Sequence, residues 1–276
     1  MSPKSASEPM GIADLAGLRG LAEAFNDVMK LRVGVTNRFE RAPIHPDSIA
    51  PLREQLEEME KVFKKTLLAE YRRNVPVPIL AWQKETLGLG DHTFARLLGH
   101  LQHPVHATPK HWVGSGKDNR VLTEGEPFDR TVGQLWSYCG LGDPSRKRKR
   151  GMDAAEALAA GSPAIRSIMF VIAEGCKKQA RSPYRAVYDA CRVKYAEHVH
   201  DKPCPPCGKT GHPAPEGSPW KKGHQQGAAL EVVAKAILKD LWLASVEGRD
   251  EAIGRAQPND APPPPPSARR KKEEAA

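Results

Sequence analysis

Cysteine is scarce in this chain of 276 residues: there are five, and only Cys204 and Cys207 lie close together. This odd number argues against the disulfide framework of a small secreted protein and favours a reducing compartment. We find no apolar run long enough to span a membrane, and the residues at 1–10 lack the apolar core of a signal peptide. We therefore expect a cytoplasmic, nucleoid-associated protein with no membrane partner.

Signals for β-strands are also scarce, so the sequence predicts a mainly α fold. Asp14 is a candidate N-cap, apolar residues recur at helical spacing from Leu15 to Met29, and the proline-containing segment "RAPIHPDS" ends this first helix. A second helix begins near Ser48 and carries a short coiled-coil seam. The seam comprises Leu52, Leu56, Met59, Phe63 and Thr66 or Leu67. We expect residues 11–75 to form a helical hairpin, which either is a dimerising arm or packs as two amphipathic helices on the domain.

The remainder divides into a helical domain at 76–245 and two segments that we expect to be disordered, 1–10 and the proline-rich charged tail 246–276. Residues 103–129 are predicted to be loop. Helical patterns return at "SPAIRSIMFVIAEGC", "SPYRAVYDACRVKYAEH" and "AALEVVAKAILKDLWLAS". Ser182 and Pro183 are expected to begin the second of these helices, and its tyrosine stripe to lie in the core.

Two glycines flank a leucine between short apolar helical patterns in "ETLGLGDHTFARLLGHL". Because glycine accepts positive φ, such a turn can bring its backbone N–H groups close to another chain. Together with the start of the next helix, these groups suit a DNA phosphate. The pattern predicts a helix–hairpin–helix element with DNA contacts from Gly88, Leu89, Gly90, His92 and Thr93; the alternative is a tight structural turn.

Positive charge dominates the chain, with 42 lysines and arginines against 33 acidic residues, a net charge of +9 and a pI near 9.3. Such a balance favours nucleic acid or an acidic surface as the partner. Five consecutive basic residues follow Ser145, and we expect them to clamp the DNA backbone: Arg146, Lys147, Arg148, Lys149 and Arg150.

The order of motifs resembles the C-terminal half of the insertion sequence 110/116/902 transposases. After the coiled coil come "TLGLGDHTFARLLGHL", "TVGQLWSYCGLGDPSRKRKRG" and "AAGSPAIRSIMFVIAEGCKK". The matching residues are Gly88, Leu89, Gly90, Thr93, Ala95, Leu135, Tyr138, Gly140, Leu141, Gly161 and Arg166. The resemblance implies a DNA-binding domain that acts in transposition or recombination.

The resemblance also implies a catalytic serine, for which Ser145 is the candidate, although the family's "SSGG" surroundings are replaced by basic residues. The family's metal-binding carboxylates lie on a RuvC-like domain ahead of the coiled coil, and the residues before Asp14 do not resemble it. Mg²⁺ is therefore expected only with a nuclease partner, and the chain alone should not cleave DNA. The implied partners are DNA, a guide RNA, a RuvC-like nuclease subunit and further copies of this chain. The alternatives are a serine transposase or recombinase that needs that subunit, or a non-catalytic interaction protein of a mobile element.

A candidate zinc site lies in "HVHDKPCPPCGKTGH", where Cys204 and Cys207 have the spacing that lets two thiolates share one tetrahedral metal ion. His212 and a further histidine would complete the site, and we assign Cys204, Cys207, His212 and His224, although His198 and His200 are also near in sequence. A plain surface loop is the alternative. We expect residues 198–224 to form a structural zinc loop inserted into the helical domain.

Overall fold

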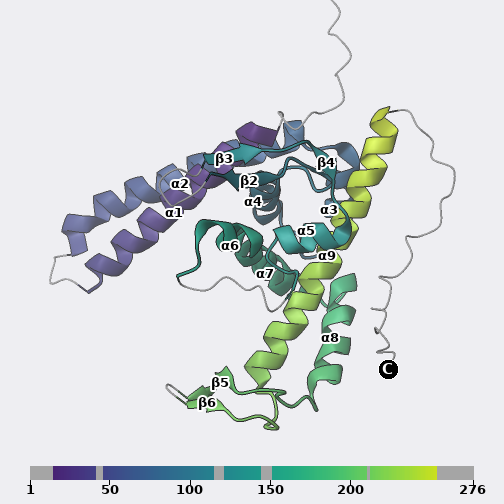
Figure 1. Cartoon of the computed structure of the whole chain (residues 1–276). Coiled ribbons are helices and arrows are strands. Elements are labelled where there is room, and N and C mark those ends of the chain that lie inside the picture. Colours follow the sequence, from purple (N-terminus) through teal and green to yellow (C-terminus); the bar gives the residue numbers. More distant parts are fainter. Residues whose placement is uncertain (1–14, 42–45, 115–120, 144–150, 210–211, 254–276) are drawn as a thin grey trace, which may run out of the picture.

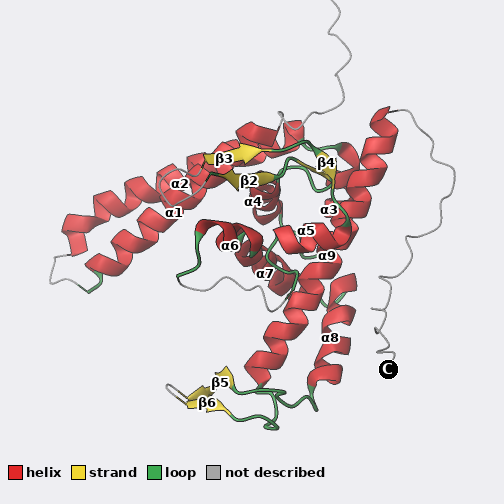
Figure 2. Ribbon diagram, viewed as in Figure 1, coloured by secondary structure: helices red, strands yellow, loops and turns green. Residues whose placement is uncertain are grey.

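The computed structural model describes residues 15–41, 46–114, 121–143, 151–209 and 212–253, and this part of the chain is mainly helical, as predicted (Figure 2). The helices are α1 Ala16–Phe39, α2 Pro46–Asn74, α3 Val77–Glu85, α4 Asp91–Leu101, α5 Val132–Tyr138, α6 Ala154–Ala159, α7 Pro163–Lys178, α8 Pro183–Tyr195 and α9 Lys222–Ile253. The strands are β1 His106–Ala107, β2 Lys110–Val113, β3 Val121–Glu124, β4 Phe128–Asp129, β5 Cys204–Lys209 and β6 His212–Ala214.

The two longest N-terminal helices, α1 and α2, lie side by side and extend beyond the rest of the molecule at one end (Figure 1). Their buried residues include Phe25 on α1 and Leu56 and Leu67 on α2. Arg32 of α1 and Glu60 of α2 form an ion pair at 2.5 Å across the contact. Of the predicted seam positions on α2, Leu56 and Leu67 are buried and Phe63 is half-buried, whereas Leu52 and Met59 are exposed, so this fold buries only part of the predicted seam.

The core is centred on α7, which packs on both α4 and α9. Helix α4 contributes its whole apolar face, from Phe94 to Leu101, because apolar residues at its helical spacing all face inward. Helix α9 runs along the length of the domain and packs on α3, α5, α7 and α8 (Figure 1). Its partner α8 begins at Pro183 with Ser182 at the N-cap, as predicted, and the Tyr184 hydroxyl lies 2.7 Å from a carboxylate oxygen of Asp240 on α9.

The prediction of an irregular loop at 103–129 is wrong, because this segment contains four short strands. Strand β1 pairs with β4, and β2 pairs with β3, both in antiparallel registers. Strands of two to four residues are too short to show a period in sequence. Their pairing depends on cross-strand contacts such as Val113 with Val121, which only the folded chain brings together.

Two other expectations about the chain's boundaries need correction. Helix α9 continues to Ile253, so the region predicted as a disordered tail starts with helix; residues 254–276 lie outside the described part. In addition, the stretch Ala154–Lys178 is long and apolar enough to cross a membrane by length and composition, contrary to our prediction. Here it forms α6 and α7, and α7 is apolar because one face, from Ile165 to Cys176, packs into the core.

Candidate metal centre and nucleic-acid surfaces

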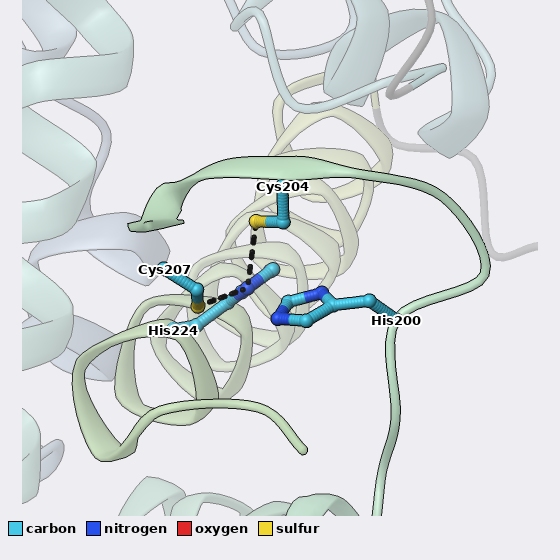
Figure 3. A group of neighbouring side chains, drawn as sticks. All are labelled: His200, Cys204, Cys207 and His224. Atoms are coloured by element: carbon cyan, nitrogen blue, oxygen red, sulfur yellow. Dashed lines mark hydrogen bonds between the residues drawn. The ribbon is translucent and has the colours of Figure 1, made fainter. Parts of the chain in front are cut away.

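Four side chains converge at the end of the molecule where α8 and α9 are joined: His200, Cys204, Cys207 and His224 (Figure 3). Their candidate ligand atoms all lie within 4.8 Å of one another. The Nδ1 atom of His224 is 3.6 Å from the Cys204 sulfur and 3.3 Å from the Cys207 sulfur. This group could hold a metal ion.

The local chain path explains how the four residues meet. Cys204 and Cys207 lie on β5, and β6 folds back so tightly that a Cβ atom on Gly208 would come 2.0 Å from the carbonyl oxygen of His212. The backbone of His200 makes two hydrogen bonds. Its N–H donates to the Ser218 carbonyl at 3.0 Å, and its carbonyl accepts from the Gly217 N–H at 2.8 Å. These bonds hold the chain before β5 against the chain that leads into α9.

Burial supports metal binding at this group. Cys204, Cys207 and His200 are nearly inaccessible to solvent, and His200 Nε2 is a buried nitrogen with no hydrogen-bond partner among the described residues. A buried imidazole nitrogen that lacks a partner is costly unless something coordinates it. Tetrahedral zinc with bond lengths of about 2.0–2.3 Å needs its ligand atoms roughly 3.3–3.8 Å apart, so the group requires only a small contraction. The residues fit the ion.

An aromatic wall supports the two histidines. The indole of Trp220 stacks on His224 with ring centroids 4.1 Å apart and planes 6° apart, and its ring lies 6.0 Å from that of His200. Tyr195 and His198 pack on the other parts of the same indole. Stacking of this kind restricts ring rotation, which orients the ligand nitrogens before a metal binds.

The structure brings together three of the four predicted ligands and replaces the other. His212 is the first residue of β6, pairs with Lys209 across the hairpin and is exposed outside the group. His200 takes its place, although it precedes the cysteines. Sequence spacing could not choose between these histidines, because each is only a few residues from the Cys204–Cys207 pair; the choice depends on how the hairpin folds.

The glycine turn between α3 and α4 divides its predicted DNA contacts into buried and accessible positions. Gly88 has φ of 101°, and a Cβ atom there would lie 2.5 Å from the Cα of Cys176 on α7. Leu89 is buried in the core. Close packing on α7 therefore accounts for glycine at 88. Gly90 is different: it is the N-cap of α4, has an ordinary φ of −72° and has open space around its Cα.

The charges at the start of α4 are arranged around a carboxylate. Gln83, a buried residue that the sequence did not single out, donates to the Leu89 carbonyl at 2.6 Å and to Asp91 at 3.1 Å. Arg72 lies 3.1 Å from the same carboxylate. Its hydrogen bond, and to a lesser extent that of Gln83, holds the pKa of Asp91 below its usual range. Burial, and then Arg96, lowers the pKa of His92 to about 4, so His92 is neutral at neutral pH. Of the predicted contacts at this turn only Gly90 is exposed, and Thr93, like Gly88 and His92, is half-buried.

Three of the motif residues that resemble the transposase family, Gly140, Gly161 and Arg166, meet although they are distant in sequence. Gly161, with φ of 78°, packs so closely that a Cβ atom would lie 2.5 Å from the backbone nitrogen of Gly140. Arg166 donates to the Gly140 carbonyl and pairs with Glu231 on α9 at 3.0 Å. These residues fix α5, α7 and α9 to one another. The catalytic candidate Ser145 and the basic residues 146–150 lie outside the described residues.

Positive charge is concentrated in the segment that runs from the end of α7 along α8 to the start of α9. Residues 177–222 contain ten lysines and arginines against four acidic residues, a net charge of +6 out of +9 for the whole chain. The exposed cations of this segment are Lys178, Arg181, Lys194, Lys202, Lys209, Lys221 and Lys222. Lys178 and Arg181 lie just before the start of α8, whereas Lys202, Lys209 and Lys221 are close in sequence to the Cys204–Cys207 pair and His224.

A scan against models of protein families gives no match for this chain, and a search of curated proteins finds none that matches it.

Proposed function

We propose that this chain is a DNA-binding protein whose basic end is ordered by a structural zinc ion. It is related in this proposal to the C-terminal half of the insertion sequence 110/116/902 transposases, and it acts in transposition or recombination. The observation that carries the DNA-binding proposal is the concentration of charge: two thirds of the net positive charge lies in residues 177–222. Cations along one segment attract the phosphate backbone without reading sequence.

Zinc is the metal that suits the ligand set. Two thiolates and two imidazoles match the tetrahedral geometry and intermediate softness of Zn²⁺, whereas Mg²⁺ and Ca²⁺ prefer oxygen ligands. All four positions are supplied by the protein, which is typical of a structural ion and not of a catalytic one. Bound zinc would lock β5 and β6 against the start of α9. Lys202, Lys209 and Lys221 would then be held on one framework.

The start of α4 is a second, weaker DNA contact in this proposal. Gly90 offers no side-chain cap to the first N–H groups of the helix, which leaves them available to a phosphate oxygen. The neighbouring carboxylate of Asp91 opposes an anion, but Arg72 neutralises it at 3.1 Å. We therefore assign the larger share of the affinity to the metal end and the smaller share to this turn.

A salt titration with matched variants tests the proposal. Lys202, Lys209 and Lys221 are changed together to Gln, and binding to a duplex of mixed sequence is measured by fluorescence anisotropy over a range of salt concentrations. Each lost phosphate contact should flatten the slope of log affinity against log salt by about 0.9. The triple variant should bind more weakly and with a flatter slope.

The control removes the same number of charges elsewhere. Lys30, Arg53 and Lys239 are exposed and lie on α1, α2 and α9, away from the metal end, and they are changed together to Gln. This control should bind DNA nearly as well as the unaltered chain. Equal weakening by both triple variants would show that binding follows total charge and would contradict the assigned surface, while no binding at low salt would remove the proposed function.

A further inference from the structure

Helix α2 presents apolar side chains to solvent on the side that α1 does not cover. Leu52, Met59 and Val62 are 41%, 46% and 56% exposed, whereas Leu56 and Leu67 of the same helix are buried. The helix thus has two apolar faces, and the described residues occupy only one of them. An exposed apolar face on a long helix is typical of a protein–protein contact.

The exposed face has an internal symmetry. At about 100° per residue, six exposed side chains fall in one stripe roughly 100° wide: Leu52, Gln55, Met59, Val62, Thr66 and Ala69. The stripe has the same spacing when read from either end, about a midpoint between Glu60 and Lys61. An antiparallel copy would therefore place Met59 beside Val62, Gln55 beside Thr66, and Leu52 beside Ala69.

Charge follows the opposite symmetry about nearly the same midpoint. Four exposed charges lie on the border of the stripe away from α1. Glu54 and Glu58 come before the midpoint in sequence, and Lys61 and Lys65 come after it. In a parallel pair this border would face the opposite border of the partner helix, so these four charges would not meet their counterparts. An antiparallel copy brings the acidic half of each helix to the basic half of the other, which attracts the two chains and fixes their direction.

We propose that α2 pairs antiparallel with α2 of a second copy of this chain, with the two-fold axis near residues 60 and 61. The stripe is about 25 Å long at 1.5 Å per residue, which is enough for several turns of helix–helix contact. The α1–α2 pair extends beyond the rest of the molecule, so a second copy can approach it there (Figure 1). This contact goes beyond the proposed DNA binding and does not depend on it.

Sedimentation velocity on the full chain tests the contact over a wide concentration range. The unaltered chain should sediment as a concentration-dependent dimer. The double variant Met59→Glu with Val62→Glu should shift to monomer while its helical circular dichroism is unchanged, because both positions are already exposed. Val193 on α8, which is 78% exposed, gives the control: Val193→Glu should leave the dimer intact. A monomeric unaltered chain at high micromolar concentration, or a dimeric double variant, would overturn the proposal.

Charge exchange then tests the direction of pairing. Glu54→Lys with Glu58→Lys should give a monomer, Lys61→Glu with Lys65→Glu should give another, and a mixture of the two should form a heterodimer. A chain that carries all four changes should dimerise with itself but not with the unaltered chain. Pairing of that chain with the unaltered one would refute the antiparallel contact. DNA binding by any monomeric variant is measured separately, so the two proposals fail independently.

Discussion

Replacing His200 should remove the metal, and replacing His212 should not. Both histidines are close in sequence to Cys204 and Cys207, but only His200 belongs to the cluster. Zinc binding to a structural site is worth roughly 10–16 kcal/mol, so an equal share for each of four ligands is about 2.5–4 kcal/mol. His200→Ala should therefore weaken zinc binding roughly a hundredfold or more, and His212→Ala should leave it unchanged.

The assay combines metal analysis of the purified, untagged protein with competition against a chromogenic chelator. His200→Cys is the rescue variant, because three thiolates and one imidazole also form a structural zinc site. It should bind zinc again, which a loss of packing alone would not allow. Emission from Trp220, isolated by comparison with Trp220→Phe, should change on chelation because its indole stacks on His224. Stoichiometric, tightly held zinc in His200→Ala, or its loss in His212→Ala, would refute the ligand assignment.

Two further predictions concern the glycine turn and its neighbour. Gly88→Ala should destabilise the fold by roughly 3 kcal/mol, because Gly88 has a positive φ and an added Cβ would clash with Cys176 on α7. Gly90→Ala should cost under about 1 kcal/mol, because a Cβ there meets open space. Equal urea-unfolding midpoints for the two variants would contradict this difference. His92, whose pKa burial lowers to about 4 from 6.5, gains a proton more readily in the unfolded chain. Its contribution to stability is thus present above pH 6.5 and lost as pH falls towards 4. This contribution amounts to about 2 kcal/mol after allowance for partial exposure. His92→Gln should flatten the curve of stability against pH between pH 6.5 and 4, and an unchanged curve would contradict the burial argument.

Local patterns in the sequence determined much of the helical structure. Apolar spacing located the two long N-terminal helices, and Pro183 marked the start of α8, because helix formation depends on residues three and four apart and on the first turn. The Cys204–Cys207 spacing identified half of the metal cluster for a similar reason. Two ligands within one short strand are placed by local geometry alone.

Tertiary structure decided the features that depend on distant segments. His200 joins the cluster because the chain before β5 pairs with the chain before α9, a contact that the positions of the histidines in sequence do not encode. Gly88 is held by the backbone of α7, nearly ninety residues later, so its role could not be separated from phosphate binding by the turn pattern. Strands β2 and β3 are stable only as a pair. The outward face of α2 could be recognised only after α1 was seen to cover the other one, because both faces carry apolar residues at helical spacing and the sequence does not state which of them the fold buries.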